Sequence, residues 1–185
     1  IKLKNNQNGF KVSQNDENIA IGFKQGSPLK EQINKIIADI PQDVREQLMN
    51  ECIDIFCGKT VEKFSLDIPD VLQDAQKLRV AIEGSYEPFN QISDKETFGC
   101  VKVVTADQSP LYANGYDVQI ARYIAAKLNR TLEIYKVDWD NLSQTVNTDV
   151  VDAVISGMSP NAQGTETLEF SDSYYRSDIV IVINK

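Results

Sequence analysis

The side chains that most often perform acid–base or metal chemistry are scarce in this chain. Its 185 residues include no histidine, which removes the commonest general base and the commonest zinc ligand. Cys52, Cys57 and Cys100 form an odd set without a CxxC spacing, so we expect free, partly buried thiols. A bridge from Cys52 to Cys57 would require a turn between them. Glu83 and Asp138 are the carboxylates that could form an acid–base pair in an enzyme, but no nucleophile triad accompanies them.

Three loops, at residues 83–89, 137–141 and 156–161, each follow a predicted strand. In open parallel sheets, ligands bind at the carboxyl ends of the strands. We therefore expect these loops to cluster on one edge of a sheet and to form any binding site there.

The elements that must position these loops alternate between strand and helix. Strands are predicted at 78–82, 131–135, 151–156 and 178–183, and the apolar strand 151–156 is typical of one buried on both faces of a parallel sheet. Helices are predicted between them, at residues 116–128 and 139–146. This alternation predicts an α/β fold with parallel pairing. Residues 90–114 show little apolar periodicity, and we expect a long loop or a ragged hairpin there.

The first third of the chain carries its own strand and helices. Asn18–Phe23 is predicted to be a buried strand, and Ser27 and Pro28 are expected to cap and begin a helix. Two helical faces follow, with apolar residues at Leu29, Ile33, Ile36, Ile37 and Ile40 and at Val44, Leu48, Cys52 and Ile55. Residues 56–76 are irregular, and we interpret them as a linker or exposed connection.

The charge balance excludes one class of partner. The chain has 27 acidic and 19 basic residues and a net charge of −8, so nucleic-acid binding is not expected. No apolar run approaches the ~20 residues that span a bilayer, and the first residues do not resemble a signal peptide. We therefore expect a mature fragment, a cytosolic protein or an excised piece of a larger one.

Six segments resemble those of a known protein family and follow one another in the same order as in that family. They are Leu78–Ile82, Ser85–Phe89, Gly115–Val118, Val137–Asp140, Val151–Pro160 and Leu168–Tyr175. With them, residues 77–185 resemble the N-terminal lobe of the polar amino-acid solute-binding family of ABC importers. That resemblance implies one lobe of a type II periplasmic-binding-protein fold, which has a mostly parallel sheet, one antiparallel return strand and helices on both faces.

The order of the parts is reversed relative to that family. Residues 18–53 resemble the family's C-terminal strand, turn and helix, with Gly26-Ser27-Pro28 at the turn. We therefore divide the chain into 1–55, the C-terminal strand and helices of the lobe; 56–76, a linker; and 77–185, its N-terminal part. Either a stretch of tandem binding domains or a circular permutation gives this order, and the natural composition of the linker favours the tandem origin. We expect Asn18–Phe23 to insert between 151–156 and 178–183, antiparallel to the former.

The resemblance implies a site for a small solute, most simply an amino acid. Ser156, Gly157 and Ser159 match backbone and hydroxyl donors for a carboxylate; the alternative is an ordinary strand-to-helix turn. Tyr86 and Trp139 match aromatic walls, with core or rim packing as the alternative.

Three further positions, Glu83, Asn161 and Gly164, affect how strongly this site is expected to bind a ligand. Glu83 matches a position that pairs with an ammonium or amide group; the alternative is a solvated surface residue. Asn161 takes the place of a threonine of the family, and Gly164 takes the place of its carboxylate-clamping arginine. A lost bidentate pair typically costs ~1.5–3 kcal/mol, so we expect weak binding by this chain.

These observations predict a non-catalytic solute-binding fragment without a cofactor or metal. Its implied partners are the solute, an ABC permease and a second lobe, and its implied location is the cell surface, tethered to the cytoplasmic membrane. A ligand-sensing module of a receptor with the same fold is the alternative.

Overall fold

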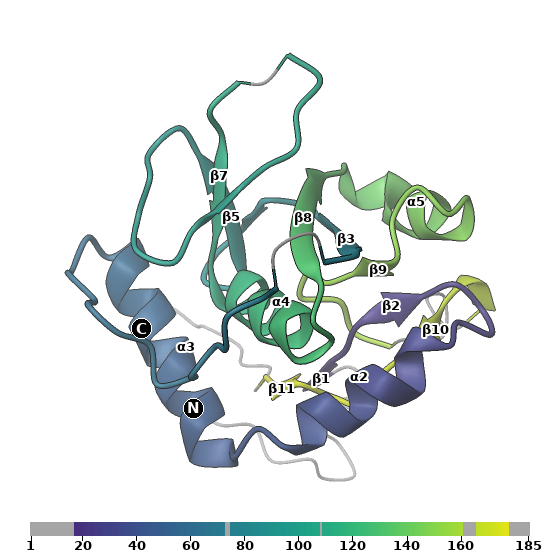
Figure 1. Ribbon diagram of the computed structural model, residues 1–185, viewed down its shortest axis with the longest axis horizontal. Coiled ribbons are helices and arrows are strands. Elements are labelled where there is room, and N and C mark those ends of the chain that lie inside the picture. Colours follow the sequence, from purple (N-terminus) through teal and green to yellow (C-terminus); the bar gives the residue numbers. More distant parts are fainter. Residues whose placement is uncertain (1–16, 73–74, 108, 161–165, 178–185) are drawn as a thin grey trace, which may run out of the picture.

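The computed structural model describes residues 17–72, 75–107, 109–160 and 166–177, which form a mixed α/β structure (Figure 1). The helices are α2 (Leu29–Ala38), α3 (Gln42–Phe56), α4 (Tyr116–Lys127) and α5 (Leu142–Asn147), with a short 3-10 helix η1 (Trp139–Asn141). The strands are β1 (Asn18–Ile19), β2 (Gly22–Phe23), β3 (Lys77–Ile82), β4 (Ser85–Tyr86), β5 (Asn90–Ser93), β6 (Val101–Lys102), β7 (Tyr112–Asn114), β8 (Thr131–Lys136), β9 (Ala153–Val154), β10 (Glu169–Phe170) and β11 (Tyr175–Arg176).

The central sheet has five strands in the order β10-β2-β9-β3-β8. Strand β3 pairs in parallel with β8 and with β9, whereas β2 is antiparallel to both β9 and β10. The parallel arrangement thus covers β8, β3 and β9, the strands that precede the three loops of interest.

A second sheet lies where the sequence predicted a loop or a ragged hairpin. Its strands run in the order β4-β5-β7-β6, and every pairing is antiparallel. The strands are short, and β5 has one buried residue out of four, which explains why apolar periodicity gave no signal.

Both faces of the central sheet are covered by helices. Along β3, Leu78, Val80 and Ile82 belong to the larger apolar cluster, which also includes buried residues of α2, α3 and α4. The alternate residue Ala81 belongs to a second cluster with Leu142 and other residues on and after α5. Because alternate residues of a strand point to opposite faces, the sheet is buried on both sides.

The N-terminal segment completes this sheet. Gly22 of β2 lies opposite Val154 of β9 and Phe170 of β10, so the expected insertion antiparallel to the 151–156 segment is confirmed. The expectation of 178–183 as its other neighbour is wrong, because β10 occupies that side; residues 178–183 lie outside the described residues.

The predicted strand Asn18–Phe23 is also interrupted. Strand β1 pairs with β11 in a separate two-stranded sheet. Between β1 and β2, the Ala20 N–H donates to the carbonyl of Met158 and the Ile21 N–H donates to Ser171 Oγ. These loop and side-chain acceptors replace ladder partners, so the chain changes sheet here.

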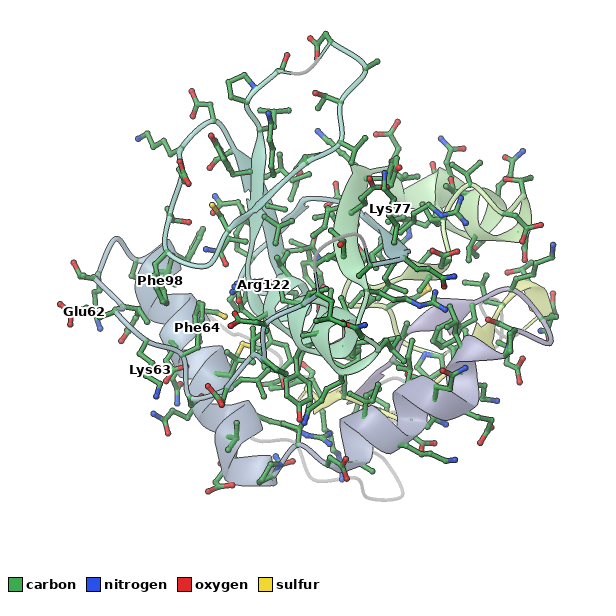
Figure 2. All side chains as sticks on the ribbon, in the orientation of Figure 1. Glu62, Lys63, Phe64, Lys77, Phe98 and Arg122 are labelled. Carbon is green, nitrogen blue, oxygen red and sulfur yellow. The ribbon has the colours of Figure 1, made fainter. Side chains whose placement is uncertain are left out.

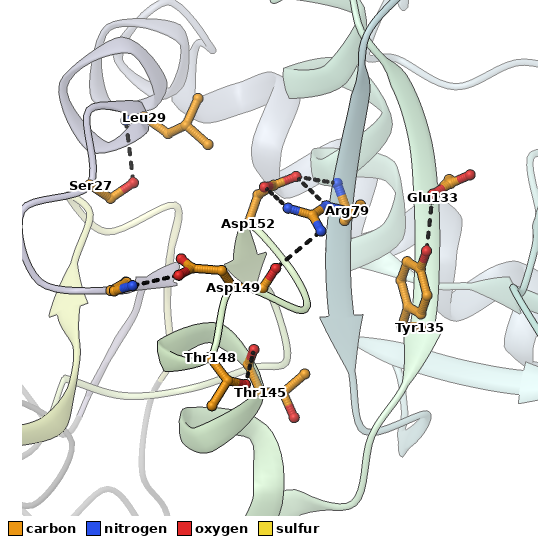
Figure 3. A network of polar contacts seen from close by, with 10 residues as sticks. Ser27, Leu29, Arg79, Glu133, Tyr135, Thr145, Thr148, Asp149 and Asp152 are labelled. Atoms are coloured by element: carbon orange, nitrogen blue, oxygen red, sulfur yellow. Dashed lines mark hydrogen bonds and ion pairs between the residues drawn. The ribbon is translucent and has the colours of Figure 1, made fainter.

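Helix α2 packs on the sheet through part of its predicted face. Leu29, Ile33 and Ile37 are buried, but Ile36 is only half-buried. The helix begins one residue later than predicted, at Leu29, whose N–H lies 3.4 Å from Ser27 Oγ (Figure 3).

Residues 56–76 contain no strand among those the structure describes, yet they are not simply exposed. Phe64 and Leu66 are buried, and the Phe64 ring lies 5.2 Å from the Phe98 ring, centroid to centroid (Figure 2). Between them, the Ser65 N–H and hydroxyl donate to the Glu51 carboxylate of α3. The expected exposed connection is therefore wrong at Phe64 and Leu66.

Ion pairs join the first third of the chain to the rest. Lys30 Nζ lies 2.7 Å from Glu169 Oε1, and the Gly26 N–H donates to the same carboxylate. In Figure 3, Arg79 of β3 binds both oxygens of Asp152, which stands immediately before β9. The Arg79 pair links two parallel strands at the ends where they begin.

Candidate functional site

A cleft of about 600 Å³ lies among the loops that follow β3, β8 and β9. Its volume is in the usual range for small-molecule sites, roughly 300–1,000 Å³. The residues that line it are Glu83, Ser85, Tyr86, Trp139, Asp140, Ser143, Gly157, Met158, Ser159 and Thr167. The three loops therefore meet at one edge of the sheet.

Tyr86 forms an aromatic wall supported from behind. Its ring stacks on Phe89 with centroids 5.2 Å apart, and Phe89 contacts Tyr116 and Tyr175 edge to face. Phe89 is buried, whereas 46% of Tyr86 is exposed. The supporting ring is thus fixed in the core and the outer ring remains open to the cleft.

Gly157 provides the space for this wall. Its φ is +60°, and a Cβ at this position would lie 2.6 Å from Cε1 of Tyr86. Glycine is therefore required both by the backbone conformation and by the close approach of the ring.

A second aromatic residue comes from the loop after β8. Trp139 opens η1, which leads directly into α5, and 51% of its surface is exposed. Asp140 follows it on η1 and is exposed in the same cleft.

Ser156 links the loop that follows β9 to the loop that follows β3. It is fully buried, and its Oγ accepts a 2.9 Å hydrogen bond from the Glu83 N–H. The Glu83 carboxylate accepts a 2.7 Å hydrogen bond from the Ser85 N–H. Ser156 therefore fixes the backbone at the end of β3 and does not itself line the cleft.

A buried carboxylate supports the same loops. Asp117 of α4 accepts hydrogen bonds from the Tyr174 hydroxyl at 2.6 Å and from Asn90 Nδ2 at 2.8 Å, and Asn90 Oδ1 accepts from the Gly84 N–H. Burial raises the pKa of Asp117 to about 6, and hydrogen bonds from Tyr174, Asn90 and the Gly157 backbone oppose this rise. Through these contacts Asp117 supports, from α4, the loops that contain Gly84 and Gly157.

The structure brings most of the predicted site residues together. Glu83, Tyr86, Trp139, Gly157 and Ser159 line the cleft, and Ser156 lies beneath it. Asn161 lies outside the described residues. Sequence reasoning missed Ser85, Asp140, Ser143, Met158 and Thr167. Asp140 could have been found as the neighbour of Trp139, whereas Ser143 and Thr167 reach the cleft only through tertiary packing.

The described part of the chain shows neither a metal-binding cluster nor a membrane-spanning helix. No group of three or more histidine, cysteine, aspartate or glutamate side chains within it could hold a metal ion. Over the same residues, every helix is too short or too polar to cross a bilayer. Cys52, Cys57 and Cys100 are free thiols, and burial raises the pKa of Cys52 to about 12.

Residues 78–185, more than half of the chain, match the family of bacterial extracellular solute-binding proteins, family 3. The chain therefore belongs to this family.

Individual relatives match this chain over part of its length and at modest sequence identity. The arginine-binding extracellular protein ArtP of Bacillus subtilis is 34% identical over 71 residues, which is 38% of this chain and 28% of that protein. The L-cystine-binding protein TcyA of the same organism is 29% identical over 108 residues, 58% of this chain and 35% of its own length. The cyclohexadienyl dehydratase of Pseudomonas aeruginosa is 27% identical over 107 residues, 58% of this chain and 34% of the enzyme. The chain thus spans about a third of the length of the curated relatives it matches, and no solved structure matches it.

Proposed function

We propose that the chain is one lobe of an extracytoplasmic amino-acid-binding protein of an ABC importer, and that its cleft contacts the solute. The observation that carries this proposal is the meeting of the loops after β3, β8 and β9 around a cleft with two exposed aromatic rings. Family membership supports the same role, and several relatives are named as amino-acid-binding proteins.

The lobe is built from both ends of the chain in reverse order. In support, β2 from the segment 1–55 lies inside the sheet that β3, β8 and β9 of the segment 77–185 form. Residues 56–76 would then join the two parts, either as the natural linker of tandem binding domains or at a permutation.

In this proposal the partners are a second lobe, an ABC permease and the membrane that tethers the parent protein. A ligand gripped by one lobe stays partly solvated, so the chain alone binds weakly. Calorimetry with arginine, glutamine, glutamate, asparagine and cystine tests this. A dissociation constant near one micromolar or below, about −8 kcal/mol, would contradict the single-lobe account.

The role is non-catalytic, although one relative is an enzyme. Asp138, the possible acid–base partner of Glu83, is exposed at the start of η1, and the second carboxylate in the cleft belongs to Asp140. Chromatography of a bound solute should recover it unchanged; conversion that depends on Glu83 would refute this role.

A further inference from the structure

We propose that Asp117 is a positioning residue of this cleft, and that the negative charge of its carboxylate is required for full solute affinity. This inference rests on the proposed function and concerns the regulation of the same site. Asp117 lies on the first turn of α4 and does not line the cleft, so it acts through the loops that do.

The side chain of Asp117 joins two segments that are far apart in the sequence. Its Oδ2 accepts a 2.8 Å hydrogen bond from Asn90 Nδ2, and its Oδ1 accepts a 2.6 Å hydrogen bond from the Tyr174 hydroxyl. All three residues are fully buried. Because these groups are shielded from solvent, the carboxylate holds both partners firmly in place.

Asn90 extends this restraint to the loop that follows β3. Its Oδ1 accepts a 2.7 Å hydrogen bond from the Gly84 N–H, and Gly84 stands between two residues that line the cleft, Glu83 and Ser85. The same bond fixes the orientation of the Asn90 amide, since Oδ1 must face the Gly84 N–H and Nδ2 must then face the carboxylate. The position of the loop therefore depends on an acceptor at Asp117.

The partners of Asp117 fit an ionised carboxylate. Asn90 Nδ2 can only donate, and a protonated carboxyl group must donate its own proton, for which only the Tyr174 oxygen could act as acceptor among these two partners. The Tyr174 hydroxyl would then lose the acceptor of its own proton. The bond from Asn90 would reach a neutral oxygen, and such a bond is about half as strong. Protonation of Asp117 therefore loosens both contacts.

Asp117 changes its charge in a range of pH that proteins commonly meet. Burial raises the pKa of Asp117 to about 6, whereas its place in the first turn of a helix favours the charged form. The carboxylate is thus largely charged above this value and largely neutral below it. Acidification should therefore weaken solute binding through the loop after β3.

The groups around Asp117 do not account for such a change. The titratable or charged groups on the elements that pack around it include Arg45, Glu51 and Cys52 of α3, Glu83 and Glu87 of the loop after β3, Tyr116 of α4, and Tyr174; β5 has no titratable side chain. Burial raises the pKa of Cys52 to about 12 and also raises the pKa values of Tyr116 and Tyr174, and an arginine stays charged. The three glutamates are half-buried and are also present in the variant described below, so the comparison removes their contribution.

The test measures solute affinity against pH with probes whose own charge stays constant. L-glutamine and L-arginine keep one charge state over this range, and the fluorescence of Trp139, the single tryptophan of the chain, reports their binding. With a midpoint near pH 6, about nine-tenths of Asp117 is protonated at about pH 5 and only a few per cent at about pH 7.5. Affinity should therefore fall about three- to tenfold between these two pH values.

Three variants separate Asp117 from other carboxylates. Asp117→Asn keeps the size of the side chain without its charge, so its affinity should stay at the low, acidic level of the wild type and should not depend on pH. Tyr174→Phe removes a donor that lowers the pKa of Asp117, so the midpoint should move upward. Asp152→Asn removes a half-buried carboxylate that precedes β9 and lies outside the cleft lining, so affinity and its pH dependence should be unchanged.

A measurement without ligand keeps the two proposals apart. In NMR spectra of the unliganded chain, the backbone N–H signal of Gly84 should titrate with a midpoint near pH 6, and Asp117→Asn should abolish this titration. A constant Gly84 signal, or an affinity that changes with pH by the same factor in wild type and Asp117→Asn, overturns the role of Asp117 but leaves solute binding intact. If neither probe nor any other amino acid named above binds at either pH up to about 50 mM, the proposed function fails and the claim on affinity fails with it.

Discussion

Replacing Gly157 with alanine should displace the aromatic wall of the cleft. The new methyl group would lie 2.6 Å from Cε1 and 2.7 Å from Cδ1 of Tyr86, distances at which the ring must move. Because about half of the Tyr86 side chain is exposed, it can swing outward, away from Phe89.

The expected loss of stability has two parts. Alanine at a φ of +60° costs about 1–2 kcal/mol. Loss of the Tyr86–Phe89 stacking costs a further ~0.5–1.5 kcal/mol. The free energy of unfolding of Gly157→Ala should therefore fall by about 2–3 kcal/mol.

Gly58→Ala is the matched control. Gly58 has a φ of +77°, but a Cβ there would meet nothing within 4 Å, so only the backbone cost applies. Urea denaturation should show a larger loss for Gly157→Ala, and the excess should vanish when Tyr86 is also replaced by alanine. Equal losses for the two glycine variants, with Tyr86 intact, would refute the packing of Tyr86 over Gly157.

Core packing and the buried carboxylate give two more expected outcomes. Ile33→Ala should lower the free energy of unfolding by about 3 kcal/mol and half-buried Ile36→Ala by about 1 kcal/mol, and equal losses in urea would contradict their different burial. Because burial raises the pKa of Asp117 to about 6, the folded state holds its proton more tightly than the unfolded state, and stability falls as the pH rises through that range. The stability difference between wild type and Asp117→Asn should decline by about 1 kcal/mol from about pH 5 to pH 7, and a constant difference would contradict the raised pKa.

The sequence predicted the parts of the fold that have strong apolar patterns. Strands β3, β8 and β9 and helix α4 appear where apolar runs and helical spacing placed them. The insertion of β2 followed from a family resemblance, because nothing in a short strand itself specifies its partners.

The interruption of the first strand could not be predicted from apolar pattern. Ala20 and Ile21 are both fully or almost fully buried, as a continuous strand would require. Their N–H groups nevertheless bind Met158 and Ser171, which are about 140 and 150 residues further along the chain. Only the folded chain brings these acceptors into reach.

The candidate site, like the fold, was predicted only in part from the sequence. Tyr86, Trp139 and Gly157 were predicted from the family resemblance, and all three line the cleft. The direction in which a polar side chain points could not be predicted: Ser156 is fully buried, and its Oγ accepts from the Glu83 N–H instead of lining the cleft. Buried polar groups must find partners, and here this requirement takes precedence over ligand contact.

The most direct test of the account is to locate the site at which the chain binds an amino acid. An NMR titration of the isotope-labelled chain with L-arginine follows the indole N–H of Trp139 and the backbone N–H of Gly157. Our account predicts that both signals shift together and saturate with one dissociation constant in the millimolar range, about −4 kcal/mol. Saturable shifts confined to residues outside the cleft, or no shift at either group at saturating ligand, would contradict it.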